Sequence, residues 1–297
     1  MVPFREKKLP LLLYILTCLT TTGAGALLSG HNPFSSIEEF LSGLPYAFSL
    51  MLILTAHEAG HFLVARRYGV DSPLPWFIPA PTLVGTFGAV IRLPRLPGRK
   101  VVLFDIALAG PMAGLVPSII ALAIGIHLSG SLSGPVTPSS GLEIGDSLLF
   151  KLMTSILIPP HSGEATLILS PVGFAGWVGL LVTSLNLIPV GQLDGGHLFY
   201  ALFGARVFRI IRWGIFPLLL VLGWVGWKGW WVWALLLFVM GPQHPPVADH
   251  EERLPRSRIA WGWAAILIEI LIFVPVPLRI HCPSRASTRE SAHCLPQ

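Results

Sequence analysis

Long runs of apolar residues, separated by short polar segments, dominate this chain. Most runs approach the ~20 residues that an α-helix needs to cross a bilayer. The pattern predicts an all-α polytopic membrane protein with about six to seven transmembrane helices. The predicted spans are Leu9–Leu28, Leu44–Ala65, Val101–Leu128, Ala165–Pro189, Ile210–Trp227, the short run Trp230–Met240, and Ile259–Ile280.

The segment between the second and third spans departs from this pattern. Residues 71–100 contain too much Pro and Gly for a helix, and Gly85–Ile91 within them predicts a short extended β segment. Irregular backbone at membrane depth is tolerated only against protein or a water-filled cavity. We therefore expect this segment to line a cavity, with an ordinary loop outside the membrane as the alternative.

The composition supports a membrane protein. The chain is 53% hydrophobic and 12% charged, whereas soluble domains carry about 25% charged residues. The net charge of +5 comes from basic residues at the ends of apolar runs, without a basic stripe interleaved with aromatics. This arrangement excludes a nucleic-acid partner and leaves the lipid bilayer as the expected environment.

Charges flanking the first two spans predict an orientation. Arg5, Lys7 and Lys8 precede the first span, and the loop after it carries Glu38 and Glu39 without Lys or Arg. By the positive-inside rule the N-terminus is cytoplasmic. We expect a bacterial or archaeal plasma membrane, with a plastid membrane as the alternative. The first span is expected to be a retained anchor, although the small residues at 24–26 also fit a signal-peptide cleavage site.

The second span contains the sequence His57-Glu58-Ala59-Gly60-His61. Histidines at positions i and i+4 share one helix face and can bind a single zinc ion. Glu58 is then placed to take a proton from water. Because ionisable residues at membrane depth are costly and usually functional, the motif indicates hydrolysis of peptide bonds within or beside the membrane.

Catalytic zinc usually has three protein ligands, so a third ligand must come from elsewhere in the chain. Few acidic residues lie inside apolar segments, and the candidates are Asp105, Asp194 and Glu269. Asp194 is the preferred candidate because Pro189 and the glycines after Asp194 break the helix and let the carboxylate reach a metal on another helix.

The other two acidic residues have alternative roles. Asp105 lies close in sequence to Arg99 and Lys100 and is expected to form hydrogen bonds locally. Glu269 lies in the last predicted span, where a packing or pairing role is expected.

Taken together, His57-Glu58-x-x-His61 and Asn186-x-x-Pro189-x-x-x-Leu193-Asp194-Gly195-Gly196 resemble the site-2 proteases, which are intramembrane zinc metalloproteases. Gly110-Pro111-x-x-Gly114 and Gly85–Ile91 resemble two further segments of that family's core, and His244-Pro245-Pro246 resembles the HPP motif of a subset. The resemblance covers about residues 45–250.

This resemblance implies one catalytic Zn²⁺ ion bound by His57, His61 and Asp194, with Glu58 as the general base. Asn186 is expected to hold the substrate backbone or the developing oxyanion. The implied function is intramembrane zinc metalloendopeptidase activity in regulated intramembrane proteolysis. Its substrate would be a transmembrane protein or a membrane-associated peptide.

Several further expectations follow. The chain divides into an N-terminal helix and outer loop (1–43), a catalytic membrane core (44–205), and C-terminal helices with a tail (206–297). Gly110 and Gly114 are interpreted mainly as a helix-packing pair. Cys282 and Cys294 can pair only in an oxidising compartment. The sequence indicates no oligomeric state. A transporter or scaffold using buried His and Asp is the alternative function, but it predicts matched repeats that the sequence lacks.

Overall fold

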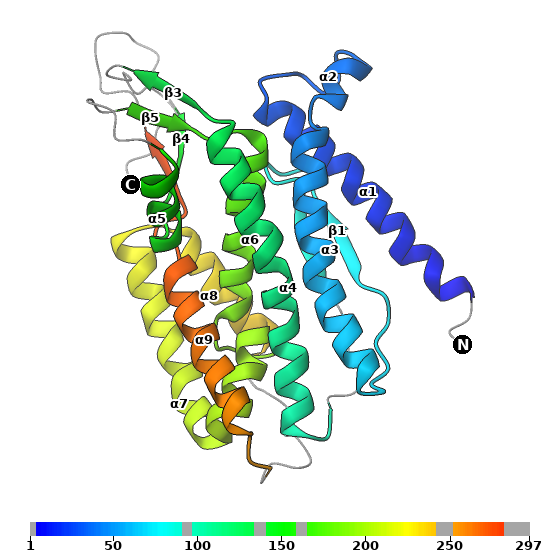
Figure 1. The fold of residues 1–297 in the computed structure, drawn as a ribbon, viewed down its shortest axis with the longest axis vertical. Helices are drawn as coiled ribbons and strands as arrows, with labels where there is room; N and C mark the ends of the chain where they lie inside the picture. Colours follow the sequence, from blue (N-terminus) through cyan, green and yellow to red (C-terminus); the bar gives the residue numbers. More distant parts are fainter. Residues whose placement is uncertain (1–3, 91–96, 134–140, 159–164, 242–251, 282–297) are drawn as a thin grey trace.

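The computed structural model describes residues 4–90, 97–133, 141–158, 165–241 and 252–281. In these ranges most of the chain is helical, and the main helices stand side by side in a bundle (Figure 1). The helices are α1 (Phe4–Leu28), α2 (Ile37–Leu41), α3 (Leu44–Arg67), α4 (Lys100–His127), α5 (Leu148–Leu157), α6 (Pro171–Leu187), α7 (Asp194–Val225), α8 (Gly229–Met240) and α9 (Arg256–Ile272).

The described strands form three small antiparallel pairs. The predicted extended segment contains strand β2, which pairs with the preceding strand β1 in a hairpin beside α3 and α1 (Figure 1). The other two pairs lie near each other at one end of the bundle. The pairs are β1 (Trp76–Pro79) with β2 (Thr86–Val90), β3 (Gly130–Ser133) with β5 (Ala165–Ile168), and β4 (Gly141–Ile144) with β6 (Leu278–His281).

Four helices of the described chain, α1, α3, α4 and α7, are long and apolar enough to cross a membrane. Helices α6 and α9 have 17 residues each and α8 has 12, so they cover about 26 and 18 Å. The prediction of an all-α polytopic membrane protein with a short extended segment is confirmed.

Some predicted span boundaries are wrong. Helix α7 begins at Asp194 rather than at Ile210, although it is broken at Gly204, where φ is 77° and ψ is 170°. The last span was predicted to reach residue 280, but α9 ends at Ile272 and the chain continues into β6. Pro275 and Pro277 explain this end, because proline has no N–H to continue a helix.

The densest packing lies where α3, α4 and α6 meet. Large side chains from all three helices are buried there: Leu50, Leu54, Phe104, Leu122, Trp177 and Leu180. This core supports α3 along the turns that carry its two motif histidines, so these side chains are attached to a well-packed helix.

Two sequence features lie outside the described residues. They are the His244-Pro245-Pro246 motif and the pair Cys282 and Cys294. The predictions attached to them remain predictions.

Candidate metal centre

The two motif histidines lie one turn apart on α3. Because α3 is continuous from Leu44 to Arg67, His57 and His61 point to the same side, as the spacing predicts. His57 is buried, and Glu58 beside it is also buried, with 6% of its surface exposed. The motif is therefore enclosed by protein instead of facing open solvent.

The turn between α6 and α7 carries the third candidate ligand. Helix α6 ends at Leu187, and α7 begins at Asp194. A Cβ atom on Gly195 would lie 1.9 Å from the carbonyl oxygen of Leu187, so only glycine allows α7 to start this close to the end of α6. This close approach sets where Asp194 stands at the first position of α7.

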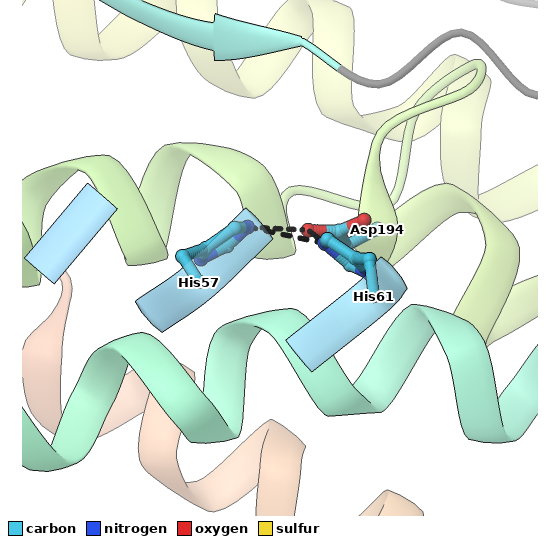
Figure 2. A group of neighbouring side chains, drawn as sticks. All are labelled: His57, His61 and Asp194. Carbon is cyan, nitrogen blue, oxygen red and sulfur yellow. Dashed lines mark hydrogen bonds and ion pairs between the residues drawn. The ribbon is translucent and has the colours of Figure 1, made fainter. Parts of the chain in front are cut away.

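The structure brings the three predicted ligands together. The Nε2 atoms of His57 and His61 lie 3.3 and 3.2 Å from Oδ2 of Asp194, and 3.2 Å from each other. Figure 2 shows the two imidazoles and the carboxylate pointing toward one another. They form a group of three side chains that can hold a metal ion.

The donor set fits zinc. Zinc binds histidine nitrogen and carboxylate oxygen at about 2.0–2.2 Å in tetrahedral sites, so two ligand atoms lie about 3.3–3.6 Å apart. The three observed separations, 3.2 to 3.3 Å, are close to this edge length. Two nitrogens and one oxygen at the three corners of one tetrahedral face leave the fourth corner open, as in catalytic zinc sites.

Helix α4 fixes the orientation of one candidate ligand. Nδ1 of His61 donates a hydrogen bond to the carbonyl oxygen of Ile106 at 2.8 Å. A proton on Nδ1 leaves the Nε2 lone pair directed toward Asp194, which is the tautomer that metal binding requires. Gly110 and Gly114 of α4 lie against His61 and His57 respectively, so α4 supports both rings.

Asn186 lies at the edge of this group. Its Nδ2 atom is 3.4 Å from Nε2 of His57. The amide comes from the last turn of α6. It therefore reaches the centre from a different helix than the two histidines, which lie on α3, and Asp194, which lies on α7. This position places an amide N–H donor next to the candidate metal centre, where sequence analysis expects it.

The structure separates the other two ligand candidates from this group. The Asp105 carboxylate accepts two hydrogen bonds from Arg258, at 2.8 and 2.7 Å, while Arg99 pairs with Glu252. The expected local partners of Asp105 were therefore wrong, because α9 supplies an arginine at close range. Glu269 accepts a hydrogen bond from Ser184 of α6 at 2.9 Å.

The sequence predicts mainly a helix-packing role for Gly110 and Gly114. They do pack, but against the side chains of the two candidate ligands of α3 rather than only against its backbone. A signal for this role is present in the sequence. The two glycines are four residues apart, as are the two histidines, and equal spacing allows the two pairs to face each other across two packed helices.

Comparisons with known proteins agree with this geometry. A sequence profile described as Peptidase family M50 matches residues 45–221, a range that contains all five predicted site residues. The chain is 29% identical over 255 residues to "Probable zinc metalloprotease EGY2, chloroplastic" of Arabidopsis thaliana, covering 83% of this chain and 44% of that protein. It is 39% identical over 166 residues to "Probable zinc metalloprotease EGY1, chloroplastic" of Oryza sativa subsp. japonica, covering 55% of this chain and 28% of that protein.

The chain spans less than half the length of these two relatives. Both relatives carry names that place them in the chloroplast and describe them as zinc metalloproteases. The matched region of this chain includes α3, α4, α6 and most of α7, which are the helices that build the candidate centre.

Proposed function

This chain belongs to peptidase family M50, the site-2 protease family, and from that membership we propose that it is an intramembrane zinc metalloendopeptidase. It hydrolyses peptide bonds within or near transmembrane segments, as in regulated intramembrane proteolysis. The observation that carries this proposal is the group of His57, His61 and Asp194, whose donor atoms lie 3.2 to 3.3 Å apart on membrane-length helices.

The proposed cofactor is one Zn²⁺ ion bound by His57, His61 and Asp194. Two nitrogen donors and one oxygen donor suit zinc and leave room for one more ligand, and relatives of the chain carry zinc metalloprotease in their names. When bound, zinc polarises a peptide carbonyl and lowers the pKa of water.

Two further side chains are proposed to take part in proton transfer and in stabilising the oxyanion. Glu58, buried beside His57 on α3, acts as the general base that takes a proton from water and passes it to the leaving amine. Asn186 donates an amide N–H to the developing oxyanion, a contact worth about 2.7–4 kcal/mol in other enzymes. His61 is held in the required tautomer by Ile106.

The β1–β2 hairpin is the proposed substrate-binding segment. A helical substrate hides its peptide bonds and must unwind before attack. Among the described residues β2 pairs with β1 alone, so one strand edge is available to pair with an extended substrate. The substrate class is a transmembrane protein or membrane-associated peptide within the lipid bilayer.

The arrangement of the rest of the chain is also a proposal. We keep a division into residues 1–43, a catalytic core of 44–205, and 206–297, with Gly204 interrupting α7 near the second boundary. We further propose a cytoplasmic N-terminus in a bacterial or archaeal plasma membrane. The chloroplast relatives make a plastid membrane the competing location.

The proposal is tested with purified, reconstituted protein and a transmembrane-segment substrate. Glu58→Gln is expected to retain zinc and lose cleavage, whereas His57→Ala loses both. His127→Ala, at the exposed end of α4, is the matched control and keeps both properties. Cleavage by Glu58→Gln at the wild-type rate would contradict the mechanism. If His57→Ala kept its full zinc content, this result would contradict the proposed metal centre and favour a transporter or scaffold.

A further inference from the structure

A second feature lies on the opposite face of α4 from the metal centre. A groove of about 610 Å³ runs between α3, α4 and α9, and its floor includes Leu108, Met112 and Val116. These residues follow the i, i+4, i+8 spacing of one helix face. They lie about half a turn from Gly110 and Gly114, so the groove and the metal centre use different faces of α4.

One end of the groove is polar. Arg258 of α9 donates two hydrogen bonds to Asp105, and the hydroxyl of Tyr68 donates to the same carboxylate. This hydrogen bond to Asp105 raises the pKa of Tyr68, so the phenol remains a neutral donor. Asp105 and Arg258 therefore neutralise each other in an ordered network at this end.

Arg67 adds a positive charge at the same end. It is exposed and lines the groove beside Tyr68. Among the residues described by the structure, Arg67 forms no ion pair with a carboxylate. Its charge also acts on Asp105. The polar end of the groove thus carries two guanidiniums, Arg67 and Arg258, against the single described carboxylate of Asp105, which leaves one positive charge in excess.

The groove is oriented along the bundle. The last turn of α3 and the first turns of α4 and α9 lie at the same end of the molecule (Figure 1). From Asp105 to Val116 the floor extends about 16 Å along α4. With α3 and α4 taken as membrane spans, the charged end is at the level of lipid headgroups and the apolar floor runs toward the bilayer core.

We propose that this groove binds an anionic phospholipid. The headgroup phosphate contacts Arg67 at the polar end, and one acyl chain lies over Leu108, Met112 and Val116. Charge complementarity favours this occupant: the excess positive charge at the polar end matches an anionic headgroup, and the apolar floor matches an acyl chain. An apolar transmembrane helix would leave that charge without an anionic partner.

The test measures lipid retained by the purified full-length protein with native mass spectrometry. Phosphatidylglycerol and phosphatidylcholine with identical chains are added in parallel. Wild type is expected to prefer phosphatidylglycerol at least fivefold. Arg67→Gln loses about that factor, since one basic residue near a membrane surface contributes about 1 kcal/mol. Met112→Trp fills the groove and lowers phosphatidylglycerol retention at least tenfold.

Two control variants match these changes elsewhere. Arg206→Gln removes an exposed arginine of α7, and Val221→Trp enlarges an exposed apolar residue of the same helix. Both are expected to bind lipid as wild type does. The proposal fails if wild type binds both lipids equally, if the controls lose as much lipid as the groove variants, or if inorganic phosphate alone displaces the lipid. Recovery of a bound peptide instead of lipid would overturn it in favour of a protein ligand.

Discussion

Gly110 of α4 lies so close to the imidazole of His61 that a Cβ atom on the glycine would come within 2.0 Å of His61 Nε2. One turn later Gly114 faces His57, but there the nearest atom would lie 3.0 Å away. The two glycines thus make unequal contacts with the two proposed ligands, and this difference can be measured.

Gly110→Ala is expected to lower zinc affinity at least tenfold and to destabilise the protein by about 1–3 kcal/mol, the usual range for overpacking. The added methyl group would displace Nε2 of His61 from the position that faces Asp194. The measurements are zinc content in a metal-buffered solution and the midpoint of thermal unfolding. Gly114→Ala is the matched control and should have a clearly smaller effect. Equal losses in the two variants would contradict this explanation.

Asn186→Ala is expected to separate catalysis from metal binding. The amide of Asn186 lies beside His57 but is not among the three proposed ligands. Cleavage should fall about 10²–10³-fold, as when an oxyanion donor is removed elsewhere, while zinc content stays at the wild-type level. The control is Ser184→Ala. Ser184 lies two residues before Asn186 on α6, and its substitution removes the hydrogen bond to Glu269. Loss of zinc in Asn186→Ala would show that its role is structural.

The candidate site could be predicted from sequence because its signals are local. The spacing of His57 and His61 fixes a shared helix face, and the Pro and Gly residues around Asp194 mark a broken helix. The basic partner of Asp105 could not be predicted in this way. Arg258 is 153 positions away in the sequence, and only the packing of α9 against α4 brings it close.

The helix ends show the same limit. Hydrophobicity identifies an apolar run but does not distinguish its helical part from a strand that pairs with a distant segment. Residues 273–280 are mostly apolar and belong to the predicted last span, yet the strand that begins at Leu278 pairs with β4. Likewise, the contact of Gly110 with His61 depends on the register of two helices, which no single segment specifies.

The turn of the β1–β2 hairpin offers a third prediction. Thr20 of α1 donates to the carbonyl oxygen of Gly85 at 2.7 Å. Gly85 has φ of 82°, and a Cβ atom on it would lie 2.6 Å from Cα of Thr21. Gly85→Ala should therefore lower the thermal unfolding midpoint more than Gly88→Ala. Gly88 has φ of 95°, but a Cβ atom on it would have no neighbour within 4 Å. The left-handed conformation costs each alanine variant about 1–2 kcal/mol, and only Gly85→Ala adds a clash. Equal midpoints would mean that α1 does not constrain the hairpin.

Glu252 links the segment before α9 to the start of α4, and this link should depend on pH. Its carboxylate accepts hydrogen bonds from the Val101 N–H at 3.1 Å and from Arg99 at 2.6 Å. Burial opposes the charge, but these donors hold the pKa of Glu252 below its ordinary value of 4.5. A lowered pKa stabilises the folded protein above pH 4.5, and this contribution is lost as the pH falls through the folded-state value.

Glu252→Gln should therefore unfold at a lower temperature than wild type at pH 7, by a difference worth less than about 1 kcal/mol, because the Arg99 side chain of the pair is largely exposed. The difference should shrink as the pH falls below 4.5, because wild type then loses the same charge. Glu38→Gln, in the first turn of α2, controls for removal of a carboxylate elsewhere. A gap between Glu252→Gln and wild type that is constant from pH 7 down to pH 3 would show that Glu252 acts through its shape and not through its charge.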